Sequence, residues 1–195
     1  MTEALSRLLT ELENFGAEND ASISDRPRRM LNITRDTGEF LSLLVRATGA
    51  RRVLEIGTSN GYSTLWLAEA VSAIGGQVTT VELSDFKINL AATTFSRSDL
   101  SPVITQLHAD AGEVLATGGD GAFDFVFLDS ERPQYAGWWP ELRRVLRKGG
   151  LLVVDNATSH PLELAPLVAL VQADDEFVSC LVPVGNGEFL ATRSA

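Results

Sequence analysis

The chain has 195 residues, of which 45% are hydrophobic and 22% charged, proportions that are typical of a globular protein rather than a disordered one. Its 16 Lys and Arg against 26 Asp and Glu give a net charge of −10, which disfavours a phosphate-binding surface and hence a nucleic-acid partner. A single cysteine, Cys180, excludes an internal disulfide, and the sequence has no Cys/His cluster for zinc.

We expect neither a targeting signal nor a membrane span. Met1-Thr2-Glu3 lacks the basic residues and the apolar core of a signal peptide. The run from Leu164 to Val171 is broken by Pro166 and is too short to span a bilayer. We therefore expect a cytoplasmic protein with no membrane partner, folded as one domain over residues 1–195.

The first 48 residues have the pattern of a helical cap. Residues 2–15 place five apolar side chains at helical spacing, namely Leu5, Leu8, Leu9, Leu12 and Phe15. The stretch Asn19–Pro27 is polar and turn-prone, and a second helix is predicted over Thr37–Thr48, where Gly49 ends it.

From residue 49 to residue 195, short apolar runs alternate with helical patterns. Strands are predicted over 52–56, 78–83, 103–107, 123–128 and 151–154, with helices over 62–73, 85–95, 111–116, 135–146 and 162–173. Two further strands, 177–182 and 188–192, flank Gly185-Asn186-Gly187, a hairpin signal. The pattern predicts a doubly wound, mostly parallel α/β sheet that ends in an antiparallel hairpin.

In such sheets ligands bind beyond the carboxyl ends of the strands, and the turn after the first strand is glycine-rich. Gly57 and Gly61 let the backbone pass close to a ligand there, although a plain tight turn would use the same residues. Ser59 and Tyr62 stand where the dinucleotide fingerprint G-x-G-x-x-G requires glycine, which disfavours an NAD-dependent oxidoreductase.

Polar residues also follow the other predicted strands. Glu82 ends the second strand, where a carboxylate accepts hydrogen bonds from both hydroxyls of a ribose, the interpretation that we favour over a solvated strand end. Asp129 and the pair Asp155-Asn156 follow two later strands and provide three oxygen donors of the kind that Mg²⁺ or Ca²⁺ binds, although Asx residues after strands often only form turns. Asp110 follows the third strand, where it either caps a helix or contacts a base ring.

Five segments, in order, resemble motifs of the cation-dependent, catechol-type O-methyltransferases that use S-adenosylmethionine. They are RRVLEIGTSNGYSTLWLA, VTTVEL, FDFVFLDSERPQY, GGLLVVDN and LPVGNGEFLATR, and they lie between about Thr37 and Arg193. The resemblance implies a seven-stranded, Rossmann-like class I methyltransferase fold, a small hydroxylated acceptor and a homodimer.

The resemblance also implies roles for individual residues. Around the methionine part of the cofactor it places Glu55, Gly57, Ser59, Gly61, Tyr62 and Ser63. Glu82 would hold the ribose, Ala109 and Asp110 would lie near the adenine, and residues 33–38 would fold over the cofactor. Asp129, Asp155 and Asn156 would bind the metal, Mg²⁺ first and Ca²⁺ or Mn²⁺ as alternatives, with Asp129 also beside the cofactor and the reacting atoms.

Two departures from the family pattern concern the acceptor. Arg132 stands where the family usually has a lysine, and a guanidinium does not act as a general base, so its expected role is to stabilise the acceptor oxyanion. An arginine that points to solvent and pairs with Glu131 or another surface acid is the ordinary alternative. The segment between Asn156 and the hairpin is also short, which leaves open a cofactor-binding protein with weak or different activity.

Overall fold

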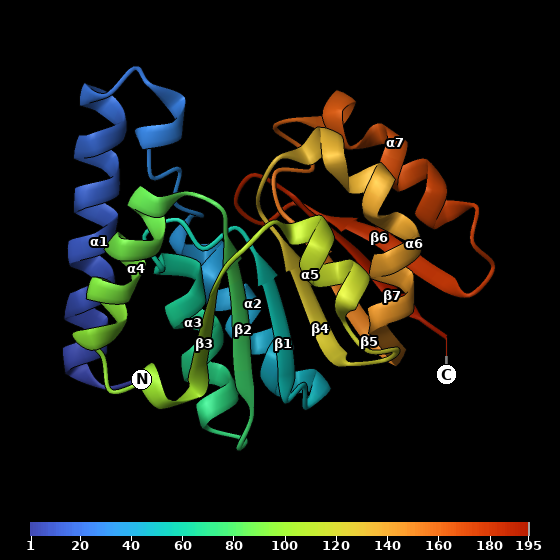
Figure 1. The fold of residues 1–195 in the computed structure, drawn as a ribbon, viewed down its shortest axis with the longest axis horizontal. Coiled ribbons are helices and arrows are strands. Elements are labelled where there is room, and N and C mark those ends of the chain that lie inside the picture. The colour runs from blue at the N-terminus through green and yellow to red at the C-terminus, as the bar shows by residue number, and fades with distance from the viewer. Residues whose placement is uncertain (195) are drawn as a thin grey trace.

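The computed structural model describes residues 1–194 and contains one seven-stranded sheet with helices on both faces (Figure 1). The strand order is β3-β2-β1-β4-β5-β7-β6. The strands are β1 Arg52–Ile56, β2 Gln77–Glu82, β3 Ile104–His108, β4 Phe123–Leu128, β5 Leu146–Val154, β6 Phe177–Val182 and β7 Glu188–Arg193. The first five strands are parallel, whereas β7 pairs antiparallel with both β5 and β6, so the fold class expected from the sequence is confirmed.

The helices divide between the two faces of the sheet. One face packs against α1 Glu3–Ser22, α2 Arg35–Thr48, α3 Tyr62–Ser72 and α4 Asp85–Ser96. The other packs against α5 Ala111–Thr117, α6 Tyr135–Val145 and α7 Pro161–Gln172. Short 3₁₀ turns lie at Arg26–Arg28, Ser101–Val103 and Arg132–Gln134. No helix within residues 1–194 combines the length and apolar composition needed to cross a bilayer.

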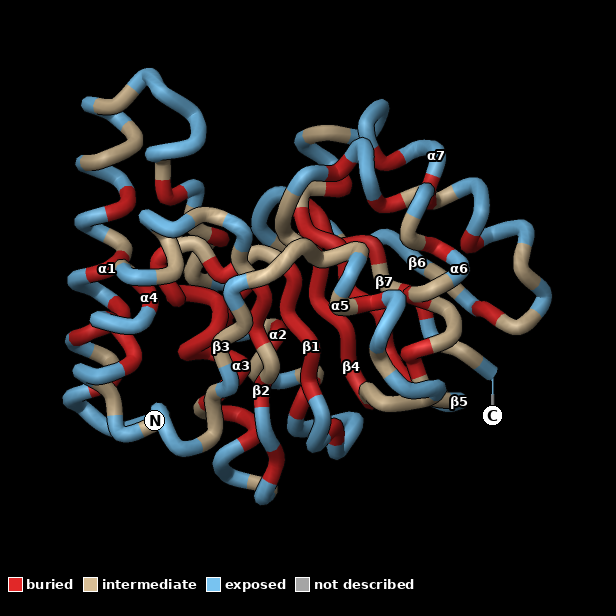
Figure 2. Tube along the Cα trace, in the orientation of Figure 1, coloured by how far each residue is buried: buried red, intermediate tan, exposed pale blue. Residues whose placement is uncertain are grey.

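The central strands are buried along most of their length, as Figure 2 shows for β1 and β4. Side chains alternate between the faces, so Val53 joins the core beneath α1–α4 while Leu54 and Ile56 join the core beneath α5–α7. Each fully buried side chain of this size contributes about 1.5–3 kcal/mol. Burial on both faces therefore explains why these runs are apolar throughout instead of alternating.

Two elements exceed their predicted length by more than two residues. Helix α1 continues to Ser22, because the carboxylate of Asp20 accepts the backbone N–H groups of Met30 and Leu31 at 2.7 and 2.8 Å and ties the polar stretch to the body. Strand β5 begins at Leu146 rather than at 151, with a register shift against β4 between Phe123 and Phe125.

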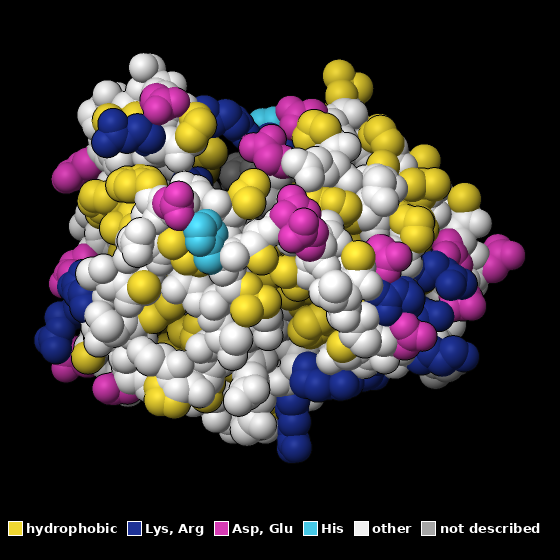
Figure 3. Space-filling view, viewed as in Figure 1, with side chains coloured by type: hydrophobic (Ala, Val, Ile, Leu, Met, Phe, Trp, Pro, Cys, Tyr) yellow, Lys and Arg dark blue, Asp and Glu magenta, His cyan; other side chains and the backbone are white. Residues whose placement is uncertain are grey.

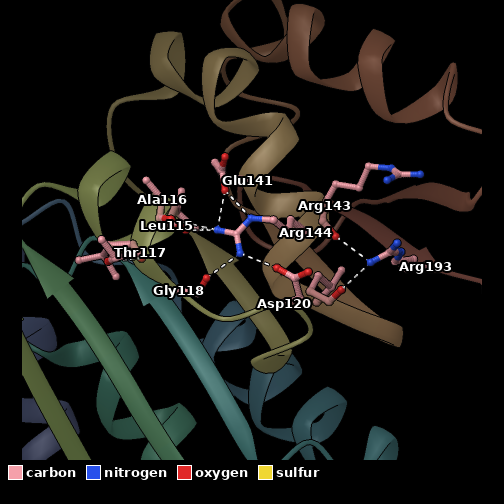
Figure 4. A network of polar contacts seen from close by, with 11 residues as sticks. Leu115, Ala116, Thr117, Gly118, Asp120, Glu141, Arg143, Arg144 and Arg193 are labelled. Carbon is pink, nitrogen blue, oxygen red and sulfur yellow. Dashed lines mark hydrogen bonds and ion pairs between the residues drawn. The ribbon is translucent and has the colours of Figure 1, made fainter.

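On the α5–α7 face, Arg144 of α6 closes the carboxyl end of α5 (Figure 4). Its guanidinium donates to the carbonyl oxygens of Leu115, Ala116 and Gly118, at 2.9, 3.2 and 2.6 Å. It also pairs with the carboxylates of Asp120 and Glu141. The last carbonyls of a helix have no partner within the helix, so this arginine supplies the missing donors.

Candidate functional site

A cavity of about 730 Å³ opens at the carboxyl ends of β1, β2, β4 and β5. Figure 3 shows a hollow in the upper part of the molecule with acidic and basic side chains near its edge. Of the residues proposed from the sequence, nine line its wall: Gly57, Ser59, Glu82, Ala109, Asp110, Asp129, Arg132, Asp155 and Asn156. This edge of the sheet is where doubly wound folds bind their ligands.

The turn after β1 approaches its neighbours too closely for any residue but glycine at position 57. Gly57 has a φ of +109°, and a Cβ there would lie 2.0 Å from the carbonyl oxygen of Asp129. Two residues on, the Ser59 hydroxyl donates to the Met30 carbonyl at 2.7 Å. The turn therefore connects the cavity wall at the end of β1 to the segment around Met30.

Glu82 is held in place by backbone donors. Its carboxylate accepts the N–H groups of Ser59, Leu83 and Ser84, each at 3.0 Å. Each carboxylate oxygen has two lone pairs, so acceptor capacity remains for a ligand. A fixed carboxylate on the cavity wall suits a ribose with two neighbouring hydroxyls.

Four residues proposed for the cofactor lie behind the wall instead. Glu55 is wholly buried and accepts hydrogen bonds from the hydroxyls of Ser63, at 2.6 Å, of Thr80, at 2.6 Å, and of Thr64. Burial raises the pKa of Glu55 to about 7. Glu55 and Ser63 therefore support the turn from beneath.

Gly61 and Tyr62 also lie behind the wall. A Cβ on Gly61 would lie 2.6 Å from the ring of Phe95, so this glycine allows α3 to pack closely. The Tyr62 hydroxyl hydrogen-bonds to Glu13 of α1 rather than reaching the cavity. Sequence position alone did not separate residues that face the ligand from residues that hold the turn.

The wall beyond β3 carries Ala109, Asp110 and Trp138. Asp110 accepts the backbone N–H of Glu113 at 3.1 Å and thereby caps α5. It also lines the cavity, so the two roles considered for it are compatible.

Asp129, Asp155 and Asn156 come together because β4 and β5 are neighbours in the sheet. The Asn156 side-chain nitrogen donates to Asp129 Oδ1 at 3.2 Å and to Asp155 Oδ2 at 2.9 Å. Asn156 has a φ of +68°, a left-handed conformation that asparagine tolerates better than most residues. Removal from bulk water and repulsion by Asp155 hold the pKa of Asp129 well above its usual range.

A third carboxyl group, Glu188 of β7, lies against Asp155 and was not foreseen from the sequence. It is fully buried, and the Thr37 hydroxyl donates to its Oε1 at 3.2 Å. Burial and then repulsion by Asp155 raise the pKa of Glu188 to about 10, which favours its protonated form. The sequence signal that could have identified it is an acidic residue at the first position of a strand that packs in the protein interior.

The donor set fits a hard divalent cation. Asp129, Asp155 and Asn156 provide two carboxylates and one amide on the same cavity wall, which is the ligand chemistry of Mg²⁺ and Ca²⁺. Within residues 1–194 no group of three or more His, Cys, Asp or Glu side chains is arranged as a metal site, so the candidate set consists of two carboxylates and one amide. Two like charges held close together are what a cation would neutralise.

Arg132 points into the molecule rather than to solvent. It is 8% exposed, lines the cavity and donates through Nε to Glu163 of α7 at 2.8 Å. The hydrogen bond from Arg132 lowers the pKa of Glu163. The ordinary alternative is thus wrong about solvent exposure, because Arg132 is buried, although its partner Glu163 is an exposed acid.

The segment over the cavity precedes the one expected. Its wall includes Arg26, Pro27, Met30, Leu31 and Asn32, and none of residues 33–38. Of those later residues, Ile33, Thr37 and Gly38 are buried and do not line the cavity.

Comparison with known proteins shows which family this chain and its fold resemble. The family model described as O-methyltransferase matches residues 3–194. A protein of Mycobacterium ulcerans named an O-methyltransferase is 31% identical over 174 residues, which cover 83% of this chain and 77% of the relative.

Two solved structures are similar over most of their length. The O-methyltransferase of Bacillus cereus, in complex with S-adenosylhomocysteine, is 25% identical, with a TM-score of 0.80 over 96% of this chain and 91% of that one. The O-methyltransferase of tomaymycin synthesis from Streptomyces achromogenes, in complex with S-adenosylmethionine, is 26% identical, with a TM-score of 0.79 over 100% and 91%.

The doubly wound sheet with its closing hairpin thus defines a Rossmann-like methyltransferase. The chain belongs to the O-methyltransferase family, as the five motifs indicated.

Proposed function

We propose that the chain transfers a methyl group from S-adenosylmethionine to a hydroxyl of a small, catechol-like acceptor, with the assistance of a divalent cation. The observation that carries the proposal is the meeting of Glu82 with Asp129, Asp155 and Asn156 on one cavity wall. The two similar structures with S-adenosylhomocysteine or S-adenosylmethionine support the choice of cofactor.

In the proposed complex Glu82 accepts the ribose hydroxyls, Ala109 and Asp110 contact the adenine, and Gly57 and Ser59 lie along the methionine part. Glu55, Gly61, Tyr62 and Ser63 act through the turn, because they lie behind the wall. Residues 1–195 would act as one domain, in which the 1–48 cap contributes the 26–32 cover. The homodimer stays a prediction.

Asp129, Asp155 and Asn156 are the residues that would hold the cation, with the buried carboxyl group of Glu188 close to Asp155. A cation bound there would lower the pKa of an acceptor hydroxyl by Lewis acidity. In the reaction an acceptor oxygen bonds to the methyl carbon while the carbon–sulfur bond breaks, and the hydroxyl proton is released to solvent or to His160 on the cavity wall.

Arg132 would stabilise the negative charge on the acceptor oxygen without exchanging a proton. Its pairing with Glu163 fixes the guanidinium plane, because Nε is already engaged at 2.8 Å and the remaining nitrogens are available to the cavity. Most of the rate enhancement would then come from holding the acceptor oxygen and the methyl group close together in the orientation that the transfer requires.

A second candidate is a cofactor-binding protein with weak or different activity. The observation that favours it is Arg132 in place of the family lysine, together with a short acceptor segment in which α7 directly follows the Asn156 loop. Both candidate proteins would bind the cofactor, but they would differ in the rate of methyl transfer to the acceptor.

The test is incubation of the protein with labelled S-adenosylmethionine, Mg²⁺ and a panel of vicinal dihydroxy aromatic compounds. Methyl transfer that EDTA abolishes and added Mg²⁺ restores is the expected result. Tight binding of S-adenosylhomocysteine with no transfer to any member of the panel would support the second candidate instead.

A further inference from the structure

The part of the cavity wall beyond the proposed metal ligands contains several polar residues. They come from the covering segment 26–32, from position 132, from the loop before α7 and from the hairpin. These polar residues are Arg26, Asn32, Arg132, Ser159, His160 and Asn186. A small aromatic acceptor entering here meets hydrogen-bonding groups and positive charge beyond its ring.

Most acids of the wall already have partners. Asp20 accepts the N–H groups of Met30 and Leu31, Glu82 accepts three backbone N–H groups, and Asp110 caps α5. Asp129 and Asp155 form the proposed metal site. Glu131 is the remaining wall carboxylate, and it is exposed.

Two arginines line the cavity wall, and only one of them has an ion-pair partner. Arg132 forms the ion pair with Glu163 at 2.8 Å, and Arg26, from the covering segment, is close enough to help lower the pKa of the same Glu163. Within the described residues 1–194, Arg26 itself makes no ion pair. Arg26, Arg132 and Glu163 together therefore have a net charge of +1, and His160 stands beside them on the wall.

We propose that Arg26 is an acceptor-specificity residue, and that the preferred acceptors carry an anionic group, such as a carboxylate, on the side of the ring opposite the reacting hydroxyl. This rests on the proposed function, because it assigns a substrate class to the same cavity. One end of the acceptor meets the carboxylate cluster, and the other meets Arg26 at the mouth. A charge-assisted hydrogen bond to an otherwise unpaired arginine is the contact that the geometry offers.

The test compares three probes with the same vicinal diol: neutral catechol, anionic 3,4-dihydroxybenzoate and cationic 3,4-dihydroxyphenethylamine. For wild type, kcat/KM for the anion should exceed that for catechol about tenfold, the size of one charge-assisted hydrogen bond. Arg26→Gln should bring this ratio close to one. The matched control is Arg28→Gln, because Arg28 lies over the Phe86 ring at 5.8 Å and does not line the cavity. In this variant the ratio of the two kcat/KM values should equal that of wild type.

Several outcomes separate this inference from the proposed function. Methyl transfer to catechol with no preference for the anion, or a preference unchanged in Arg26→Gln, overturns the inference and leaves the function standing. A preference for the cation that Glu131→Gln removes also overturns it and assigns selectivity to Glu131.

If no probe is methylated, the proposed function fails, and calorimetry with 3,4-dihydroxybenzoate decides the inference alone. Titration into protein with S-adenosylhomocysteine and Mg²⁺ should then show binding that Arg26→Gln weakens about tenfold. Equal affinities, or no binding to wild type, would contradict it.

Discussion

Two aspartates at opposite ends of β4 have opposite electrostatic surroundings. Asp124, at the start of the strand, accepts the backbone N–H groups of Arg51 and Arg52, both at 2.9 Å, and pairs with the side chains of Arg52 and Arg147. These donors hold its pKa down, at about 2. Asp129, just past the other end, faces Asp155, and its pKa is raised.

The difference separates charges that stabilise the fold from charges that the fold holds for a ligand. Asp124 binds side chains of opposite charge and also the backbone N–H of Arg52, where β1 begins. Arg144 likewise binds carboxylates and the backbone carbonyl groups where α5 ends (Figure 4). Asp129 and Asp155 have each other, one amide and a protonated Glu188. Like charges kept close cost stability, and clusters of this kind are typical of functional sites.

The largest expected effect concerns the two acids beside the cavity, Asp129 and Asp155. Asp129→Ala or Asp155→Ala should lower Mg²⁺-dependent methyl transfer on the order of 10³-fold, because a carboxylate ligand is lost. Binding of S-adenosylhomocysteine, measured by calorimetry, should change little. Asp120→Ala, an exposed acid beside Arg144, is the control. Full activity that EDTA still blocks would mean that the metal lies elsewhere.

Glu55 extends the comparison to a buried acid with neutral partners. Its pKa of about 7 lies above its usual value, so its protonated form stabilises the fold, and this stabilisation is lost as pH rises from about 4.5 to about 7. Over that window wild type should lose about 3 kcal/mol relative to Glu55→Gln. Urea denaturation at a series of pH values measures it, with Glu3→Gln as an exposed control. Parallel curves for wild type and Glu55→Gln would show that Glu55 is ionised throughout.

Arg132 is a positive charge that acts on both Asp129 and Asp155. Arg132→Ala should reduce kcat on the order of 10²-fold, as expected for loss of one donor to an oxyanion. Arg132→Lys should retain activity, because the positive charge remains. Arg143→Ala is the control, since Arg143 pairs with Asp174 away from the cavity. Wild-type turnover in Arg132→Ala would show that the position has no part in the reaction.

Glu82 shows the smallest of these effects. Glu82→Ala should weaken S-adenosylmethionine binding by about 1.5–3 kcal/mol, because the ribose loses a charged acceptor. Calorimetry measures this, and Asp85→Ala, a highly exposed acid at the start of α4, should bind as wild type does. Unchanged affinity in Glu82→Ala would remove Glu82 from the site.

The order of the elements could be read from the sequence because the pattern was strong and local. Strands β1, β4 and β6 begin and end where expected, since each is a short run rich in apolar residues with clear ends. The end of α1 was missed because it depends on Asp20, whose partners lie about ten residues away.

The site was predicted where it follows from strand ends and not where it depends on packing. Glu82, Asp129 and Asp155 lie on one wall because parallel strands end together. Three features of the site depend on contacts between residues that are distant in sequence. They are the position of Glu55 behind the turn, the pairing of Arg132 with Glu163 of α7, and the burial of Glu188 beside Asp155. Periodicity does not encode such contacts.

The central claim is that β4 carries a stabilising acid at one end and an acid held for a ligand at the other. Urea denaturation of Asp124→Asn and Asp129→Asn at pH 7 without divalent cations tests it most directly. Asp124→Asn should cost about 2 kcal/mol, a loss that fades as pH falls from about 4 to about 2, because the pKa of Asp124 is lowered. Asp129→Asn should cost nothing or stabilise by about 1 kcal/mol, since it relieves repulsion by Asp155. Equal destabilisation by both substitutions would contradict the claim.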